Sequence, residues 1–409
     1  MSAPPQRARA DGIHTGTPIV IFGLSRGVLH HGALGIARSA GRLGIEVHRV
    51  ARERWSPASV SRFGRRWITV ADGSSDEHIL QTLRDLAAEI GGAILIPVDD
   101  AGSVFVDTHA ASLQTDFLFP KQPPGLAQEL SSKREMYEIC VKHDIPTPQC
   151  RFPRSEAELL ELADETEYPT VAKCINAGDT PASSPRVVIA QNRTQLLEAY
   201  RLMESPKGSN VMLQEYIPGT PESVWMFNGY FDPCSDCHIG ITGKKIRQSP
   251  PYTGATTLGV CEANPQVYDT TTRLMKVLGY QGILDIGYRF DHRDGLYKLL
   301  DVNPRIGGSF RLFVADDGSD VLRAMYRDLT GQPLPNGRAV EGRRWIVEPL
   351  DVASSITYRR RGDITLARWI GSLKGVREAA WWARDDPLPF LALLLSAPLH
   401  LLSRLRPRR

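Results

Sequence analysis

The stretch Leu299-Leu300-Asp301-Val302-Asn303-Pro304-Arg305 is the most informative part of this 409-residue chain. An acid and an amide two positions apart project from the same face of a strand, because side chains alternate. Both supply oxygen ligands, which suit Mg²⁺, and Mg²⁺ sites typically combine one or two carboxylates with substrate phosphates. Pro304 ends the strand, and the forked guanidinium of Arg305 suits phosphoryl oxygens. The stretch therefore predicts a strand that ends at a metal and phosphate site.

A second acid lies upstream, in Gly282-Ile283-Leu284-Asp285-Ile286-Gly287. Asp285 is the one charged residue of this otherwise apolar strand. A neighbouring strand that places Asp285 beside Asp301 would create a pair of carboxylates, which is unstable without a cation between them. We therefore predict that Asp285, Asp301 and Asn303 bind a divalent cation, Mg²⁺ with Mn²⁺ as an alternative.

The first 120 residues read as strands that alternate with helices. Strands are expected at 18–22, 45–50 and 93–97, and helices at 32–43 and 77–90. This alternation is typical of a parallel sheet wrapped by helices. We expect an α/β domain over 17–120, preceded by a disordered N-terminus at 1–16.

The following segment contains several strands with little helix between them. They are predicted at 168–175, 187–190, 211–216, 223–231, 238–246, 282–290 and 297–302. This pattern favours an antiparallel sheet, and hence an α+β domain over 121–335 whose two subdomains divide near residue 205. Residues 336–409 are expected to form a helical extension with an apolar and basic tail.

The arrangement of these motifs resembles the ATP-grasp superfamily, whose members hold nucleotide phosphates with two lysines. Lys133, which opens a helix within 131–135, is similar to the first, and Lys173, at the end of 168–173, to the second. The resemblance covers roughly residues 120–329. It implies a pre-ATP-grasp domain with a parallel sheet, followed by a two-lobed ATP-grasp domain with an antiparallel sheet.

The same resemblance assigns the nucleotide-base segment to Val211-Met212-Leu213-Gln214-Glu215-Tyr216-Ile217-Pro218-Gly219. It implies that Glu215 accepts from the adenine amino group and that the backbone around Tyr216 and Ile217 reads the ring edge. Glu222, seven residues on, matches the acceptor for the ribose hydroxyls. One departure lies at 174–185, where the family has a glycine-rich loop that closes on the phosphates. This stretch has one Gly and two Pro, and Ser183 and Ser184 are candidate substitutes as hydroxyl donors.

The resemblance implies an ATP-dependent carboxylate–amine ligase, most similar to predicted ligases related to D-aspartate ligase. ATP and Mg²⁺ are the implied cofactors, and a small carboxylate and an amino acid the implied substrates. Arg305 would stabilise the migrating phosphoryl group. Lys244, Lys245 and Arg247 form a basic cluster that is either a solvated strand edge or a contact for an acidic substrate or a phosphate, and Arg247 is the residue we select from it. A nucleotide-binding regulator without turnover and a peripheral membrane adaptor are the alternatives.

Three other loops are open to interpretation. Gly23-Leu24-Ser25-Arg26-Gly27 lacks the spacing of a dinucleotide fingerprint. Asp99-Asp100 follows a predicted strand and is either a substrate contact or a plain helix cap. Cys234-Ser235-Asp236-Cys237-His238 matches a haem-attachment pattern but lies where a hairpin turn is expected.

Composition sets the remaining expectations. Charged residues make up 23%, and 49 basic against 46 acidic side chains leave a net charge of +3, which gives no reason to expect a nucleic-acid partner. Six Cys in so long a chain are not a disulfide scaffold. The polar N-terminus predicts a cytoplasmic protein, with a homodimer left open. The apolar 387–402 and the arginines after it fit a segment that contacts anionic lipid at the inner face of the membrane, or a packed C-terminal helix.

Overall fold

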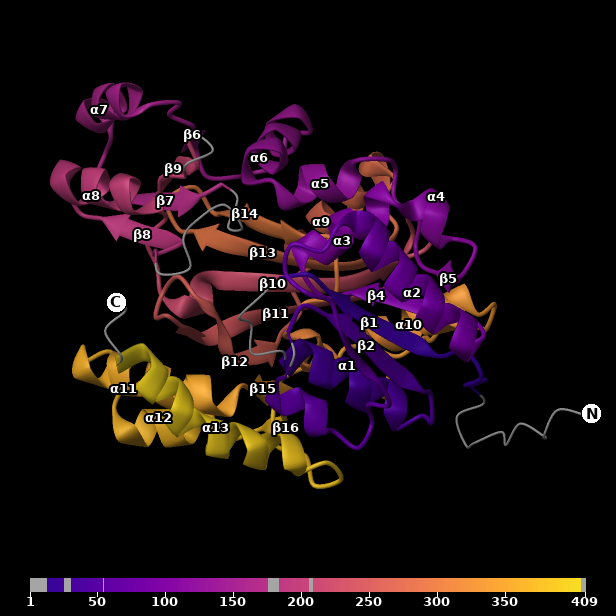
Figure 1. Cartoon of the computed structure of the whole chain (residues 1–409). Coiled ribbons are helices and arrows are strands. Elements are labelled where there is room, and N and C mark those ends of the chain that lie inside the picture. The colour runs from indigo at the N-terminus through magenta and orange to yellow at the C-terminus, as the bar shows by residue number, and fades with distance from the viewer. Residues whose placement is uncertain (1–12, 26–30, 54, 176–183, 206–208, 406–409) are drawn as a thin grey trace, which may run out of the picture.

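The computed structural model describes residues 13–25, 31–53, 55–175, 184–205 and 209–405, and for 397–405 only the helical backbone. Its strands form three sheets of five, seven and four strands (Figure 1). The predicted mixture of an N-terminal parallel sheet and a later, mainly antiparallel sheet is confirmed.

The five-stranded sheet is parallel throughout. Its order is β3 (Trp67–Thr69), β2 (Val47–Ala51), β1 (Ile19–Gly23), β4 (Ala93–Pro97) and β5 (Phe117–Leu118). Helices α1 (His31–Gly41), α2 (Asp76–Ile90), α3 (Asp100–Thr108) and α4 (Ala110–Leu113) accompany it. Helix α2 shows why the sequence signals worked. The hydroxyl of Ser75 caps its first turn, and Gly91, at φ 77°, ends it in a left-handed conformation.

The seven-stranded sheet is the largest element of the fold. Its order is β14 (Leu296–Asn303), β13 (Gly282–Asp291), β10 (Val224–Phe231), β11 (Cys237–Ser249), β12 (Ala255–Cys261), β15 (Arg344–Ile346) and β16 (Val376–Ala379). All its pairs are antiparallel except β15 with β16. The helical extension expected for 336–409 also contains two strands, β15 and β16, which extend the sheet at one edge.

The smallest sheet lies on a separate lobe. Its antiparallel order is β6 (Cys150–Arg151), β9 (Val211–Glu215), β7 (Thr170–Cys174) and β8 (Val187–Ala190). Helices α7 (Glu156–Glu165) and α8 (Arg193–Met203) pack on it around a core of its own that includes Leu159, Leu196 and Leu213. The remaining helices are α5 (Leu126–Ser131), α6 (Lys133–Lys142), α9 (Pro265–Leu278), α10 (Val321–Leu329), α11 (Glu348–Arg360), α12 (Leu366–Ser372) and α13 (Leu388–Leu405), with short 3₁₀ turns η1 (Pro57–Val60), η3 (Pro221–Ser223) and η4 (Phe310–Leu312).

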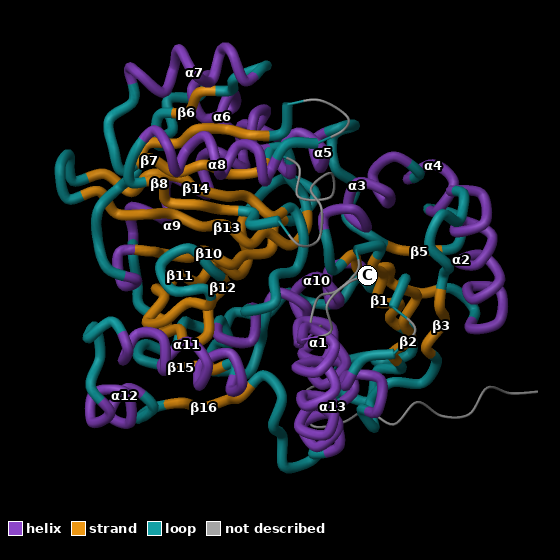
Figure 2. The backbone as a smooth tube through the Cα atoms, turned by 60° about the vertical axis from the view of Figure 1, so that its left-hand side comes forward, coloured by secondary structure: helices purple, strands orange, loops and turns teal. Residues whose placement is uncertain are grey.

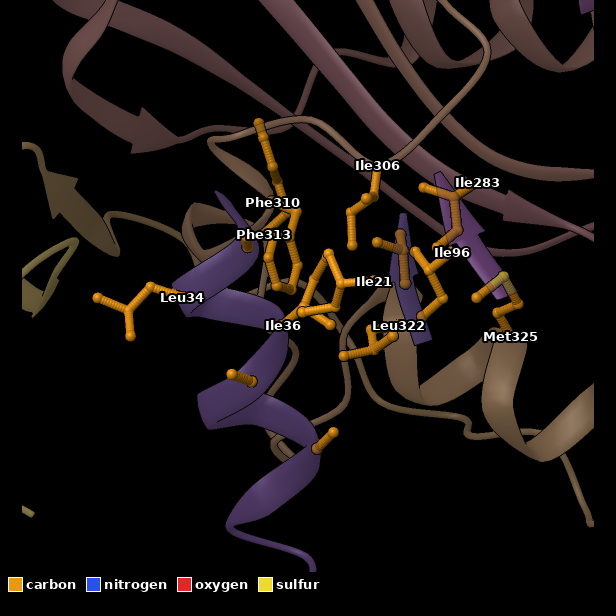
Figure 3. Packing of buried hydrophobic residues seen from close by; sticks show 14 of the residues in the cluster. Ile21, Leu34, Ile36, Ile96, Ile283, Ile306, Phe310, Phe313, Leu322 and Met325 are labelled. Atoms are coloured by element: carbon orange, nitrogen blue, oxygen red, sulfur yellow. The ribbon is translucent and has the colours of Figure 1, made fainter. Parts of the chain in front are cut away.

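The N-terminal sheet and the seven-stranded sheet share one hydrophobic core. Ile21 and Ile96 of the parallel sheet pack in the same cluster as Ile283 of β13, Phe310 of η4 and Met325 of α10 (Figure 3). Because this apolar surface is removed from water at the junction, the two parts hold a fixed relation to each other.

The chain start is tied to the same region. Ile13 packs against the shared core, and the backbone N–H of His14 donates to the side chain of Gln332 at 2.8 Å. Residues 13–16 thus differ from the disordered N-terminus expected for 1–16. Residues 1–12 lie outside the described part of the chain.

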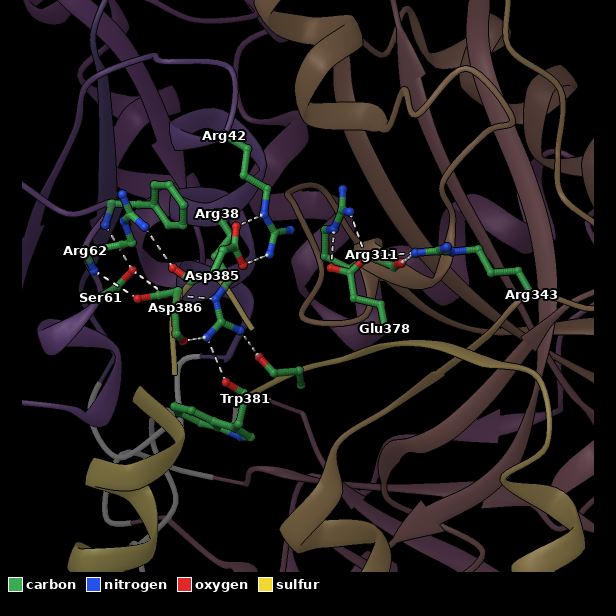
Figure 4. A network of polar contacts seen from close by, with 12 residues as sticks. Arg38, Arg42, Ser61, Arg62, Arg311, Arg343, Glu378, Trp381, Asp385 and Asp386 are labelled. Atoms are coloured by element: carbon green, nitrogen blue, oxygen red, sulfur yellow. Dashed lines mark hydrogen bonds and ion pairs between the residues drawn. The ribbon is translucent and has the colours of Figure 1, made fainter. Parts of the chain in front are cut away.

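The C-terminal segment returns to the N-terminal domain. Helix α13 packs on η1 and lies beside α1 in the turned view (Figure 2). Just before it, the buried carboxylate of Asp386 accepts from Arg38 Nε at 3.0 Å, from the hydroxyl of Ser61 at 2.7 Å and from the backbone N–H of Arg62 at 3.0 Å (Figure 4). In the described ranges no helix has the length and apolarity required to cross a membrane.

Replacing Asp386 with Ala should destabilise the fold strongly. The guanidinium of Arg38, whose side chain is 3% exposed, would then be buried without its counter-charge. Loss of one partner of a buried pair costs about 3–5 kcal/mol. Urea unfolding followed by circular dichroism measures the change.

Asp385 provides the matched control, because its pair with Arg42 is exposed at the surface. Asp385→Ala should cost less than about 1 kcal/mol. Equal losses for the two variants would contradict the structural role assigned to Asp386.

Candidate functional site

A cleft of ≈ 1480 Å³ opens where the three sheets meet. Its wall combines residues of the N-terminal domain, the four-stranded lobe and the seven-stranded sheet. Nine of the eleven residues predicted from the sequence line it: Lys133, Lys173, Glu215, Tyr216, Ile217, Asp285, Asp301, Asn303 and Arg305. Glu222 and Arg247 are not in this lining.

The register of β13 and β14 brings the predicted metal ligands together. Asp285 lies opposite Asn303, and Gly287 lies opposite Asp301. Asp301 and Asn303 share a face because they are two residues apart. Asp301 is therefore the diagonal neighbour of Asp285, at about 7–8 Å across the strand pair.

The two carboxylates have different surroundings. Burial raises the pKa of Asp285 to about 6, against the opposing influence of Arg305 and Lys245. Burial alone would also raise the pKa of Asp301, but the charges of Lys133, Lys173 and Arg305 outweigh it and lower that pKa. Asp285 is thus the less compensated of the two carboxylates, and a nearby cation would favour its ionised form.

This donor set fits a magnesium ion. Two carboxylates and one amide supply oxygen ligands, and nucleotide phosphates would complete the shell. Among the described residues, no group of three or more His, Cys, Asp or Glu side chains is arranged so that it could hold a metal ion by itself. Closed sites of that kind suit other metals better than a Mg²⁺ ion that arrives with a nucleotide.

Lys133 and Lys173 reach the cleft from two different elements. Lys133 opens α6, whose first turn is capped by the hydroxyl of Ser132, and its Nζ lies 2.7 Å from Asp301 Oδ1. Lys173 lies on β7, and its Nζ donates to Gln214 Oε1 at 2.7 Å. The carboxylate of Asp301 raises the pKa of Lys133, whereas burial and the charge of Lys133 lower the pKa of Lys173 to about 8.

The predicted base segment consists of β9 and the residues that directly follow it. The carboxylate of Glu215 pairs with Arg293 and accepts from the backbone N–H of Gln149 at 3.2 Å. The carbonyl of Ile217 accepts from Arg289 Nε at 2.8 Å. Each of these acceptors has a second lone pair, so base recognition by this segment stays a prediction. Glu222 lies exposed in η3, away from the cleft lining, and this position does not support the expected ribose contact.

Arg247 does not line the cleft, so its position does not support a catalytic role. Its guanidinium forms a buried ion pair with Asp351 of α11, with Nε and Oδ1 2.8 Å apart. Lys245, two residues earlier, lines the cleft, and burial lowers its pKa against the carboxylates of Asp285 and Asp301. A register shift between Lys245 and Arg247 separates the two, so the choice of Arg247 from the basic cluster was wrong and Lys245 was missed.

An acidic residue of the N-terminal domain binds the side chain of Arg305. Its Nε donates to Asp100 Oδ1 at 2.7 Å, and its Nη2 to Asn303 Oδ1 at 3.1 Å. Asp99 caps α3 by accepting from the backbone N–H of Gly102, and it also accepts from that of Ser25 at 2.9 Å. The Asp99-Asp100 pair thus acts both as a helix cap and as a cleft residue.

Some lining residues carried no sequence signal. His31, the first residue of α1, and Trp345 of β15 line the cleft, and their rings are 5.7 Å apart. They meet only because the N-terminal domain and the C-terminal strands converge. Residues 176–183, most of the predicted phosphate loop with Ser183, lie outside the described residues.

Residues 130–309 match the sequence model of the ATP-grasp domain family. Residues 130–309 therefore form an ATP-grasp domain, which confirms the resemblance drawn from the motifs of this segment.

Among characterised proteins, the chain is similar to D-aspartate ligase of Enterococcus faecium (strain Aus0004). They are 25% identical over 245 residues, which is 58% of this chain and 58% of the ligase. The chain thus spans less than two thirds of that relative's length. Among solved structures it is similar to an L-amino acid ligase from Bacillus licheniformis (TM-score 0.62, 17% identity, 80% of this chain and 78% of that one). It is also similar to an N5-carboxyaminoimidazole ribonucleotide synthetase in complex with ADP (TM-score 0.61, 15% identity, 81% of each chain). At these identities the two structures establish a shared fold.

Gly307 offers a test of the metal site. A Cβ atom on Gly307 would overlap the carboxylate of Asp285. Gly307→Ala should therefore displace Asp285 and weaken Mg²⁺-dependent ATP binding at least about tenfold, or 1.4 kcal/mol. Isothermal titration calorimetry with and without Mg²⁺ measures the effect.

Gly371→Ala in α12 is the control, because a methyl group there meets open space. It should leave ATP affinity unchanged. Unaltered Mg²⁺-dependent binding in Gly307→Ala would rule out a metal site that depends on the position of Asp285.

Proposed function

We propose that this chain is an ATP-dependent ligase that joins a carboxylate to an amine. The observation that carries the proposal is the convergence of Lys133 and Lys173 with Asp285, Asp301 and Asn303 on one cleft. In the proposed reaction the substrate carboxylate attacks the γ-phosphorus of ATP, which gives an acylphosphate and ADP. The amine then attacks the acyl carbon, phosphate leaves, and loss of a proton from nitrogen gives the amide.

The residues of the cleft bind and orient the reactants. Lys133 and Lys173 would hold the nucleotide phosphates, and Asp285, Asp301 and Asn303 would hold Mg²⁺, with Mn²⁺ as the alternative. A bound cation would neutralise negative charge on the phosphates and so favour phosphoryl transfer. Arg305 would stabilise negative charge on the transferred group, since phosphoryl transfer depends mainly on positioning and electrostatics.

The similarity to D-aspartate ligase supports an amino acid as one of the two substrates. The extent of the cleft supports a second substrate, which is either larger than the amino acid or bound at a separate position. Its wall continues from the phosphate end to Ser25, His31 and Asp99 of the N-terminal domain. A cleft with walls from both domains excludes water better than an open surface, which protects an acylphosphate from hydrolysis.

Purified protein with Mg²⁺ and ATP should release phosphate only when a suitable carboxylate and an amine are both present. Pools of amino acids and small acids, read by phosphate release and by mass spectrometry of the condensation product, provide the test. Asp301→Asn should keep the fold and reduce turnover by roughly 100-fold or more, because it removes one preorganised electrostatic group. ATP binding without phosphate release in any mixture would instead favour a nucleotide-binding regulator.

Asp100→Asn should lower kcat about tenfold while the KM for ATP changes little. Asp100 contacts Arg305 and not the lysines assigned to the phosphates, so its loss should release Arg305 from its working position. Adding Arg305→Lys to this variant should cost less than the same change in the wild type, because both substitutions remove one shared interaction. Fully additive losses would show that Asp100 does not act through Arg305.

A further inference from the structure

The loop at 250–254, which connects β11 to β12, lies between the cleft and a second cavity. The second cavity has a volume of ≈ 520 Å³. Tyr252 and Thr253 of the loop line both spaces. Because open space lies on two sides of the loop, side-chain packing alone does not fix its position. The contacts that hold it are therefore informative.

The backbone of this loop is strained. Tyr252 has a φ of 71°, in the left-handed region that is unfavourable for a bulky side chain. Two residues on, a Cβ atom at Gly254 would lie 2.0 Å from the carbonyl group of Ser249, so only glycine fits there. Strained backbone of this kind persists only where the surrounding structure holds it.

The contacts that hold Tyr252 come from the end of α11, outside the segment that matches the ATP-grasp model. The hydroxyl of Tyr252 donates to the carboxylate of Asp363. Its backbone N–H donates to the hydroxyl of the buried Tyr358 at 3.2 Å, and the two tyrosine rings are 5.2 Å apart. The guanidinium carbon of Arg361 lies 5.7 Å from the centre of the Tyr252 ring. The C-terminal segment thus anchors the loop through one residue.

The same helix also holds the two strands that border the loop. On β11, Arg247 forms its buried ion pair with Asp351, and the carbonyl of Gln248 accepts from the hydroxyl of Ser354. On β12, the hydroxyl of Thr257 donates to Asp351 at 3.0 Å. Helix α11 therefore fixes both ends of the loop as well as its middle.

The loop in turn fixes Lys245, which lines the cleft. Lys245 Nζ donates to the carbonyl of Gly254 at 3.1 Å, and Gln248 Nε2 donates to the same carbonyl at 2.8 Å. Among the described residues, this carbonyl is the one hydrogen-bond acceptor of Lys245. An ammonium group has three N–H donors, so two remain for a ligand. The position of Gly254 thus sets the direction in which Lys245 enters the cleft.

We propose that Tyr252 is a positioning residue, through which the C-terminal segment aims Lys245 at the phosphates of the bound nucleotide. The inference rests on the proposed function, because it takes the cleft to bind a nucleotide. Lys133 is already paired with Asp301, whereas Lys245 is held by a neutral carbonyl and keeps its charge for an anion. The segment after residue 336, although outside the matched 130–309, thereby contributes to the site.

Nucleotide binding tests the proposal without any need for turnover. Isothermal titration calorimetry of the full chain with Mg²⁺ and a non-hydrolysable ATP analogue measures the affinity. Tyr252→Phe keeps the ring but loses the hydroxyl donor, and it should weaken binding at least about fivefold. Asp363→Ala should weaken it equally, whereas Asp363→Asn, which keeps an acceptor oxygen, should restore most of the affinity. Hydrogen exchange at 249–256 should accelerate in the two weakened variants only.

Tyr230→Phe is the matched control, because it removes another hydroxyl that donates to an aspartate, Asp328, at a residue that does not line the cleft. It should leave the affinity unchanged. Lys245→Met should weaken binding at least about tenfold, and adding Tyr252→Phe to it should cost less than about twofold, because the two residues serve one contact.

Unchanged affinity in Tyr252→Phe and Asp363→Ala would overturn the proposal. So would fully additive losses in the double variant, since Tyr252 would then act by a route other than Lys245. A wild type that binds the analogue but joins no carboxylate to an amine would contradict the proposed ligase, and the binding data would still decide the role of Tyr252.

Discussion

The pairing register of β13 with β14 is the constraint on which the cleft depends. It sets Asp285 opposite Asn303 and makes Asp301 the diagonal neighbour on the same face. A slip of one residue would turn every side chain of one strand to the other face and separate the acids. Hydrophobic packing on the opposite face of the strands stabilises this register. Leu284 and Ile286 alternate with Asp285 and are buried in one hydrophobic cluster with Val302. Gly307 then passes so close to Asp285 that no side chain fits there. The chemistry of the site is therefore a consequence of packing on the opposite face of the same strands.

A second constraint is the junction between the N-terminal domain and the large sheet. Its shared core includes Ile21, Ile96 and Phe310, and it lies beside the ion pair of Asp100 with Arg305. Apolar burial fixes the distance between the N-terminal domain and the large sheet. Because this distance is fixed, the ion pair with Asp100 holds the guanidinium of Arg305 in one orientation. Domains that moved freely would hold Arg305 in water, where its attraction for a phosphoryl group is weaker. Thus the junction both stabilises the fold and prepares the site.

Much of the site was readable from sequence because its residues sit on regular elements. Lys133 at a capped helix start and Asp301 on an alternating strand are placed by local rules. The predictions from sequence were wrong or incomplete where contacts between segments far apart in the chain determine the structure. Because the register shifts beside Arg247, its side chain pairs with Asp351, more than a hundred residues away in the sequence. Lys245 lines the cleft instead. Strands β15 and β16 are three and four residues long, too short for a periodic signal, and exist because a sheet edge was available. Asp100 reaches Arg305 across 205 positions, a relation that no local pattern encodes.

At the end of the cleft assigned to the phosphates, cationic and anionic side chains partly offset one another's charge. Four cationic side chains, from Lys133, Lys173, Lys245 and Arg305, face three carboxylates, from Asp100, Asp285 and Asp301. Pairing is incomplete, since Lys173 has a lowered pKa of about 8 and Asp285 a raised one of about 6. Both shifts mean that burial opposes the charged form of these groups. An anionic phosphate chain would stabilise the lysine, and a divalent cation would stabilise the aspartate. One ligand that brings both charges together, a nucleotide with its magnesium ion, relieves both costs at once. In the function proposed here this combination would compensate both groups, whereas either charge alone would leave one of the two uncompensated.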